Sequence, residues 1–147
     1  ISETLTLIKG IIMATFADIN LADGSATPVT HTFKTKTSSG RVATWEDRVN
    51  GIPVGYNKLI VETKDNESVR RVKLSLAVPT LEAVSGANSS GFTPPATVAY
   101  THRVNLEFML PQRGIAQNRK DILAYAKNSL AHATIAAIIV DGDEIAG

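Results

Sequence analysis

The sequence predicts an α+β domain in which β-strands come first and helices last. In residues 56–64, 68–79 and 98–110, apolar side chains recur at every second position, which is the period of a strand with one buried face. Beyond Pro111 the period of the apolar side chains lengthens to about 3.6, the period of a helix. The residues on this helical stripe are Ile115, Ile122, Leu123, Ala126 and Leu130. Because strands followed by helices are typical of α+β proteins, we expect the helices to cover one face of a sheet.

Residues 1–12 allow two interpretations. Lys9-Gly10 can be encoded by the purine-rich bases of a bacterial ribosome-binding site, and Met13 follows shortly after. Residues 1–12 would then be a translated leader or a cloning-derived extension, and residues 13–147 would form a single domain. Alternatively, Leu5 and Leu7 belong to an ordinary extra strand, because the stretch has β character. The intact mass of protein made from the native gene context distinguishes the two.

The next segments predict a β-hairpin and a further strand. Two short extended runs at residues 16–19 and 29–33 flank turn-forming residues, which are Asp23, Gly24 and Pro28. A strand is then expected at residues 42–49, and the side chains on its buried face would be Ala43, Trp45 and Val49. Residues 50–53 turn the chain.

Three later strands share one polar face. They are predicted at residues 56–64, 68–79 and 98–110, with a turn at residues 65–67. Because side chains alternate across a strand, polar and aliphatic residues separate onto opposite faces. The polar face carries Lys58, Ile60, Glu62 and Lys64 from the first strand, Arg71, Lys73 and Ser75 from the second, and Arg103, Asn105 and Glu107 from the third. This face is the best functional clue in the sequence.

The remaining segments raise the question of what covers the apolar face. Residues 85–96 are rich in Gly, Ser and Pro and predict a long exposed loop. Residues 133–140 could form a short helix or a strand, and their alanines favour the helix. Two short helices cover less than the apolar side of a sheet with this many strands. A second copy of the chain could cover the remainder in a symmetric dimer.

Composition excludes several classes of protein. The chain has 147 residues, a formal net charge of +1 and no cysteine. General polybasic binding, disulfides, thiolate metal sites and a thiol nucleophile are therefore not expected. No apolar run approaches the roughly 18–20 residues that a membrane span requires.

The residues do not predict an enzyme or a metal site. The three histidines, His31, His102 and His132, lie far apart and lack the spacing of metal ligands, so structural roles are expected for them. No phosphate loop or nucleophile motif is present, and no cofactor is expected. Glu62 and Glu107 could form an acid/base pair, but neighbouring Lys and Arg are their better partners.

The polar face could bind RNA. Its basic residues could neutralise phosphates, and Asn105 and Ser75 could hydrogen-bond a base edge or a ribose. Tyr100 and Phe108, which could stack on bases, are predicted on the opposite face, leaving Tyr56 and the guanidinium of Arg103 as substitutes. The alternative is that this face is polar only because it meets water.

The order of these features resembles that of the coat proteins of small single-stranded RNA bacteriophages, the leviviruses. The segments that carry the resemblance are Val42-Ala43-Thr44-Trp45, residues 56–64, the basic strand ending in Val78-Pro79, the Gly/Ser/Pro loop, Val104-Asn105-Leu106-Glu107, and Leu110-Pro111 before a helix. The resemblance implies an N-terminal hairpin, a five-stranded antiparallel sheet and two C-terminal helices. It also implies a homodimer that interlocks through these helices and shares a ten-stranded sheet.

The same resemblance implies a function. The dimers would assemble into an icosahedral shell in the cytoplasm of a bacterial host, and the protein would reside in the virion. The polar face would bind single-stranded genomic RNA, including an operator hairpin whose binding represses replicase translation. The RNA-facing positions carried over are Lys58, Ile60, Glu62, Lys64, Arg71, Lys73, Ser75, Arg103, Asn105 and Glu107. Arg103 stands where some relatives have a base-stacking tyrosine.

Two other functions remain open on the residues alone. One is a sheet-based RNA-binding regulator that does not assemble, and the other is a small α+β enzyme. Particle formation distinguishes the coat protein from both.

Overall fold

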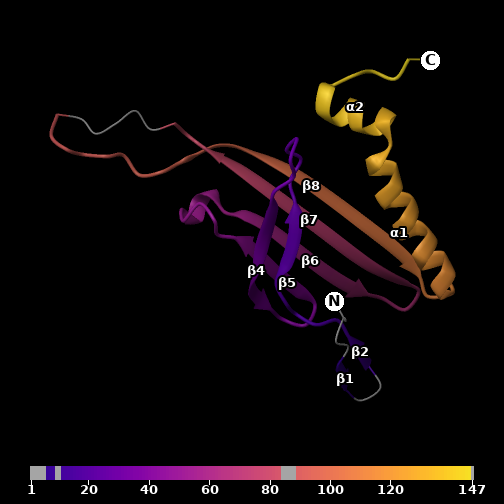
Figure 1. Ribbon diagram of the computed structural model, residues 1–147. Helices are drawn as coiled ribbons and strands as arrows, with labels where there is room; N and C mark the ends of the chain where they lie inside the picture. Colours follow the sequence, from indigo (N-terminus) through magenta and orange to yellow (C-terminus); the bar gives the residue numbers. More distant parts are fainter. Residues whose placement is uncertain (1–5, 9–10, 84–88, 147) are drawn as a thin grey trace. The chain divides into compact units, whose positions relative to one another are not determined.

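The computed structural model describes residues 6–8, 11–83 and 89–146, with side chains from residue 14 onward (Figure 1). Its strands are β1 (Thr6–Ile8), β2 (Ile11–Met13), β3 (Ile19–Ala22), β4 (Thr30–Ser38), β5 (Val42–Asp47), β6 (Asn57–Asp65), β7 (Val69–Leu81) and β8 (Val98–Pro111). Its helices are the 3₁₀ turn η1 (Pro53–Gly55), α1 (Ala116–Ala131) and α2 (Ala133–Asp141). The predicted order of strands followed by helices is confirmed.

The N-terminal stretch contains a small strand pair. β1 and β2 pair antiparallel, with Thr6 opposite Met13 and Ile8 opposite Ile11. Lys9-Gly10, on which the leader interpretation depends, lies outside the described residues. Where the natural protein starts therefore stays a prediction.

Strand β4 belongs to both the hairpin and the sheet. Its first half pairs with β3, with Phe33 opposite Ile19. Its second half pairs with β5, with Thr35 opposite Trp45, and the register shifts between Thr35 and Thr37. The full order is β3-β4-β5-β6-β7-β8. The predicted hairpin and five-stranded sheet are thus both present, because β4 to β8 make the sheet and β3 adds a sixth strand beyond β4.

The core lies between the hairpin and one face of the sheet. Phe33, Trp45 and Leu59 are its buried hydrophobic residues, and β5–β6 pairing places Trp45 opposite Leu59. The partly buried residues that pack against them are Ile19, Ala43, Val61, Leu74 and Leu76. Burial at an interior of this kind stabilises each large side chain by about 1.5–3 kcal/mol.

Trp45 also fixes the segment that precedes the hairpin. Its Nε1 donates a hydrogen bond to the carbonyl oxygen of Ala17 at 2.9 Å. The Phe16 ring meets the indole edge-on, with 5.3 Å between ring centroids. The predicted burial of Trp45 is confirmed, but that of Val49 is wrong: Val49 is 82% exposed because β5 ends at Asp47 and the chain turns there.

Contacts divide the chain into two compact units. One comprises residues 1–65 and 71–109, and the other comprises residues 66–70 and 110–147. The loop predicted at residues 85–96 falls between β7 and β8, and residues 84–88 lie outside the described part.

Both predicted helices are present in the second unit. Helix α2 ends at Gly142, whose φ of 70° is the left-handed conformation that glycine adopts readily. Neither α1 nor α2 contains a buried residue, so Ile122, Leu123 and Leu130 of the predicted stripe are exposed in the single chain. Neither helix alone is long and apolar enough to cross a membrane; the two together have the required length and composition but bend by 58°.

Candidate nucleic-acid interface

Strand pairing places the residues of β6 on the face opposite the core. Residues directly opposite in an antiparallel pair point to the same side of the sheet. Trp45 lies opposite Leu59 on the core side, whereas Glu46 lies opposite Lys58 and Val42 opposite Glu62 on the other side. By alternation, Ile60 and Lys64 share the side of Lys58 and Glu62. We call this side of β6, β7 and β8 the polar face.

The residues of β7 and β8 join the same face. Leu74 packs against the core, so Arg71, Lys73 and Ser75 point the other way. Arg71 Nη1 lies 4.0 Å from Oε1 of Glu107, which places Glu107 on the polar face. By alternation along β8, Arg103 and Asn105 share that face. The structure therefore brings together all ten residues that the sequence assigned to it.

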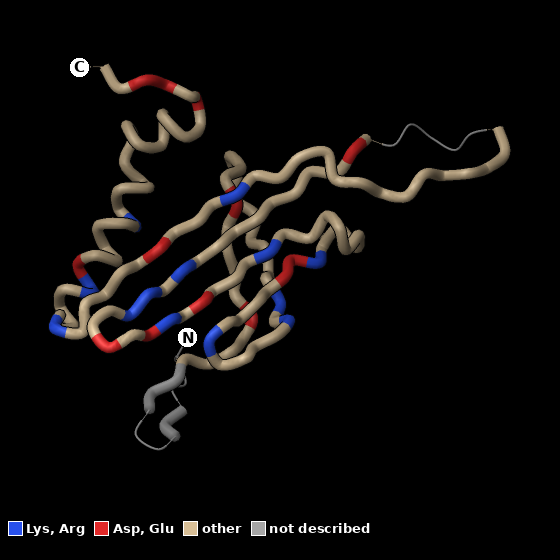
Figure 2. Tube along the Cα trace, turned by 180° about the vertical axis from the view of Figure 1, so that it is seen from behind, with Lys and Arg blue, Asp and Glu red and all other residues tan. Residues whose placement is uncertain are grey.

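The polar face is open and carries an excess of positive charge. Its residues are exposed except for Ser75, which is partly buried. Basic and acidic residues are interspersed along its strands in the Cα trace coloured by charge (Figure 2). Five basic residues, Lys58, Lys64, Arg71, Lys73 and Arg103, stand against two acidic residues, Glu62 and Glu107. Because the Arg71–Glu107 pair is half-exposed, it leaves both side chains free to exchange partners.

The aromatic residues of β8 lie on the other side, as predicted. Tyr100 and His102 meet edge to face with 5.5 Å between ring centroids, and alternation along β8 places both on the face opposite Arg103. Tyr100 is 57% exposed there, although the sequence pattern assigns it to the apolar face. On the polar face of β8, a base would therefore stack on the guanidinium of Arg103.

A buried carboxylate on β5 extends the charged surface beyond the predicted residues. Glu46 is 5% exposed and lies on the side of Lys58. Lys36 Nζ lies 2.6 Å from its Oε1, and Arg48 Nε lies 3.3 Å from its Oε2. The hydrogen bond from Lys36 and that from Arg48 hold the pKa of Glu46 below its usual value. Alternation in residues 44–48 is the signal that could have located this group.

His31 connects the hairpin to the sheet. Its Nδ1 lies 2.9 Å from Oδ2 of Asp47 at the end of β5, and its Nε2 lies 3.1 Å from Oδ2 of Asp23 between β3 and β4. A neutral imidazole has one N–H donor, whereas the imidazolium has two. Because each ring nitrogen faces a carboxylate, the geometry favours the protonated ring. We call these three residues the His31 bridge.

Both carboxylates of the His31 bridge are held by further hydrogen bonds. Asp47, whose side chain is 4% exposed, accepts from Asn57 Nδ2 at 3.2 Å and from the Val49 N–H at 3.2 Å. Asp23 accepts two backbone N–H groups of its own turn, at 3.0 and 3.1 Å. Within the described residues, no group of three or more His, Cys, Asp or Glu could hold a metal ion. The His31 bridge joins Asp23, between β3 and β4, to Asp47 at the end of β5.

The His31 bridge predicts a stability that depends on pH. Hydrogen bonds to Asp23 and Asp47 raise the pKa of His31 above its ordinary value of 6.5. Its contribution is therefore fully present below pH 6.5 and is lost as the pH rises through the raised pKa. The pKa of Asp23 is lowered, first by the Val29 N–H and then by His31, so its contribution is lost only when the pH falls through that low value. We expect the bridge to be strongest between these limits.

The measurement is the free energy of unfolding of the wild type and of His31→Gln at a series of pH values. The difference between the two should shrink as the pH rises above neutrality. His102→Gln is the matched control, because His102 makes no hydrogen bond to a carboxylate of the described residues. A wild-type advantage that stays constant from acid to alkaline pH would contradict the ionised bridge.

A match to a protein family identifies the kind of protein that has this fold and this polar face. A family model described as levivirus coat protein matches residues 14–145. The chain belongs to the levivirus coat protein family. The resemblance drawn from the sequence is confirmed, and this coat protein has a structural role in a capsid. The family is one of structural proteins and not of enzymes.

Solved structures support the assignment of this coat protein. The virus-like particle of bacteriophage ESE058 has 33% sequence identity and a TM-score of 0.80, covering 88% of this chain and 98% of the phage chain. The virus-like particle of bacteriophage NT-214 has 29% sequence identity and a TM-score of 0.79, covering 90% of this chain and 100% of the phage chain. The protein capsid of bacteriophage GA has 16% sequence identity and a TM-score of 0.66, covering 87% of this chain and 96% of the phage chain. It shares the fold. No curated protein matches this coat protein by sequence.

Proposed function

We propose that this coat protein forms homodimers, assembles into an icosahedral shell and binds single-stranded RNA on the polar face. The observation that carries the RNA proposal is the convergence of ten exposed or partly exposed residues from three strands on the face opposite the core. The shell proposal is supported by the similarity to virus-like particles of bacteriophages. Synthesis and assembly would take place in the cytoplasm of the bacterial host.

The end of the sheet supports a dimer. β8 is the last strand in the order, so among the described strands it has β7 on one side only. Its side chains on the core side include Tyr100 and Val104, which are 57% and 47% exposed. A long strand with a free edge and an exposed apolar face is prone to pair with another chain. Pairing of β8 with β8 of a second copy would join the two five-stranded sheets into the ten-stranded sheet expected from the sequence.

The helices support the same conclusion. Large apolar side chains are exposed in the single chain, and they are Ile122, Leu123, Tyr125 and Leu130 of α1 with Ile139 and Val140 of α2. A helix with such side chains needs an apolar partner to be stable. A second copy supplies one if the helices of the two chains interlock.

RNA binding would combine general and specific contacts. The five basic residues of the polar face can neutralise phosphates at any sequence. Asn105 and Ser75 can hydrogen-bond a base edge or a ribose, and Ile60, Glu62 and Glu107 would line the surface between these contacts. Binding of an operator hairpin, and repression of replicase translation through it, would require the specific contacts in addition to the general ones.

The first experiment is expression of the chain in bacteria, followed by size exclusion, negative-stain microscopy and the ratio of absorbance at the nucleic-acid and protein maxima. Uniform particles that contain RNA are expected. Stable dimers that bind RNA without assembling would instead indicate the regulator, and a monomer without RNA would contradict both.

Charge reversal on the polar face should reduce the RNA content of the particles. The variant is Arg71→Glu with Lys73→Glu, which removes two cations from neighbouring positions of β7. For single-stranded RNA, the slope of log affinity against log salt should fall by about 0.7 for each lost phosphate contact. Dimers should remain intact, because both side chains lie away from the core.

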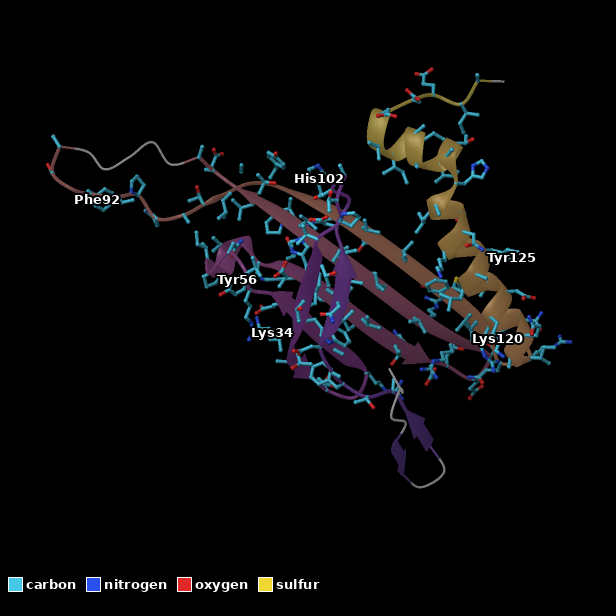
Figure 3. All side chains as sticks on the ribbon, viewed as in Figure 1. Lys34, Tyr56, Phe92, His102, Lys120 and Tyr125 are labelled. Atoms are coloured by element: carbon cyan, nitrogen blue, oxygen red, sulfur yellow. The ribbon has the colours of Figure 1, made fainter. Side chains whose placement is uncertain are left out.

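Lys120→Glu with Lys127→Glu is the control for this variant. Both lysines are exposed on α1, which is not one of the three strands of the polar face, and the two substitutions reverse the same number of charges. Lys120 is labelled in Figure 3. An unchanged RNA content in Arg71→Glu with Lys73→Glu particles would count against the polar face, as would an equal loss in the control.

A further inference from the structure

We propose that the RNA-binding surface continues past β6 to a second group of cations on β4 and at the end of β5, where it takes RNA phosphates. The group consists of Lys34, Lys36, Arg48 and Lys58 around the buried carboxylate of Glu46, and we call it the Glu46 cluster. The inference rests on the proposed function and adds a part of the surface that the sequence did not assign.

The register of three strands places the Glu46 cluster on the side of the polar face. Lys34 of β4 lies opposite Glu46 of β5, and Glu46 lies opposite Lys58 of β6. Lys36 lies at the register shift in β4, between Thr35 and Thr37, and its ammonium group donates a hydrogen bond to Glu46. Lys58 belongs to both sets, so the polar face and the Glu46 cluster form one continuous surface.

Glu46 holds two of the cations in position. Its two carboxylate oxygens are used separately, one by Lys36 at 2.6 Å and the other by Arg48 at 3.3 Å. A terminal nitrogen of Arg48 also donates to the carbonyl oxygen of Thr35 at 3.4 Å. Because Glu46 is buried while Lys36 and Arg48 are 47% and 41% exposed, the carboxylate is shielded and the cations face solvent.

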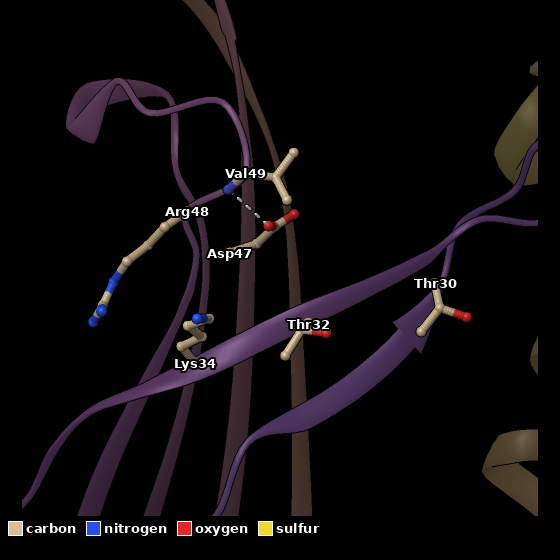
Figure 4. Close-up of a pocket in the computed structure, with 6 residues that line it drawn as sticks. All are labelled: Thr30, Thr32, Lys34, Asp47, Arg48 and Val49. Atoms are coloured by element: carbon tan, nitrogen blue, oxygen red, sulfur yellow. Dashed lines mark hydrogen bonds between the residues drawn. The ribbon is translucent and has the colours of Figure 1, made fainter.

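The cluster keeps a clear excess of positive charge. Four basic residues surround one carboxylate, and Lys34 makes no ion pair or hydrogen bond through its side chain with a described residue. Lys34 and Arg48 both line an open depression of about 420 Å³, together with Thr30, Thr32, Asp47 and Val49 (Figure 4). The Asp47 carboxylate is already bonded to His31, Asn57 and the Val49 N–H.

The chemistry of the depression suits a phosphate. Ammonium and guanidinium groups are the side chains that bind phosphate oxygens most strongly, and threonine hydroxyls add neutral donors. The depression adjoins the polar face, which is already expected to bind RNA. One RNA strand can therefore contact the polar face and the depression together. RNA is therefore favoured over a separate anionic partner.

The test measures RNA affinity of the full-length protein, freed of co-purified RNA, for a single-stranded oligonucleotide of mixed sequence over a series of salt concentrations. Lys34→Gln with Arg48→Gln should lower the slope of log affinity against log salt by about 1.4, the value for two lost phosphate contacts. Glu46→Gln, which removes a negative charge without changing shape, should strengthen binding. Loss of the fold would disperse the cations of the cluster, so a gain of affinity in a variant shown to be folded keeps the test decisive if the double variant fails to fold.

Lys120→Gln is the matched control, because it removes one positive charge from α1 and should leave the slope unchanged. Arg71→Glu with Lys73→Glu separates the two proposals. If that variant weakens binding while the Glu46 cluster variants do not change it, the extension to β4 and β5 is overturned and the polar face stands. If none of the variants changes binding, RNA binding by this side of the sheet is overturned as a whole.

Discussion

Replacement of Trp45 by alanine is expected to lower the free energy of unfolding by about 3–5 kcal/mol. The indole fills the centre of a small core with Phe33 and Leu59, contacts the Phe16 ring and donates a hydrogen bond to Ala17. Because domains are stable by only about 5–15 kcal/mol, the variant should be only marginally folded. The hairpin should loosen first, since Trp45 fixes the segment that leads into it. Denaturant unfolding at a fixed protein concentration measures the loss.

Two variants control for this experiment. Trp45→Phe keeps most of the apolar volume but loses the hydrogen bond to Ala17, so it should cost less than half as much. Val49→Ala removes an exposed side chain and should change stability by no more than about 0.5 kcal/mol. Equal losses in Trp45→Ala and Val49→Ala would show that the core lies elsewhere.

The second large effect is expected on assembly. Val104→Asp should abolish particle formation while leaving each chain folded, because Val104 is 47% exposed in the single chain and lies on the apolar side of β8. In the proposed dimer this side is covered, and an unpaired buried charge costs about 3–5 kcal/mol. A two-fold interface would contain the substitution twice, so the cost counts twice. Size exclusion and microscopy of the purified variant measure the outcome.

Val49→Asp is the matched control for Val104→Asp. It makes the same chemical change at another exposed valine, which lies in the turn after β5. Particles should form from the control and not from the β8 variant. Normal particles from Val104→Asp would contradict the proposal that a second copy covers the apolar side of β8.

The alternation of side chains was sufficient to predict the polar face. Period-two patterns separate Leu74 from Arg71 and Lys73 without knowledge of any neighbouring strand, and the structure bears out that separation. The same local rule placed Tyr100 on the opposite face. Features that depend only on the sequence near a residue were therefore predictable.

Features that depend on strand register were not predictable. The His31–Asp47 contact spans 16 positions and the Lys36–Glu46 contact spans 10, and both depend on how β4 pairs with β5, including the register shift between Thr35 and Thr37. The alternation of residues 42–49 also gave no sign that the strand ends at Asp47, so Val49 was wrongly assigned to the core.

The helices show a different limit. Their positions followed from the period of about 3.6, and α1 and α2 begin and end close to where the pattern changes. The same stripe also predicted burial, yet Ile122 and Leu123 are exposed in the single chain. A pattern of apolar residues indicates that a surface will be covered, but it does not say whether the cover comes from the same chain or from another.

The order of the sheet also has a kinetic consequence. Each strand from β4 to β8 is hydrogen-bonded to the strand that precedes it in the chain. Pairing of consecutive strands keeps contacts local in the sequence, which favours rapid folding, and the pairs can form in the order in which a ribosome releases the strands. β8, the strand proposed to meet the second copy, is the last strand of the sheet to be synthesised, and the helices follow it. Pairing of two coat proteins would therefore begin only when each chain is nearly complete, which protects the free edge from premature association.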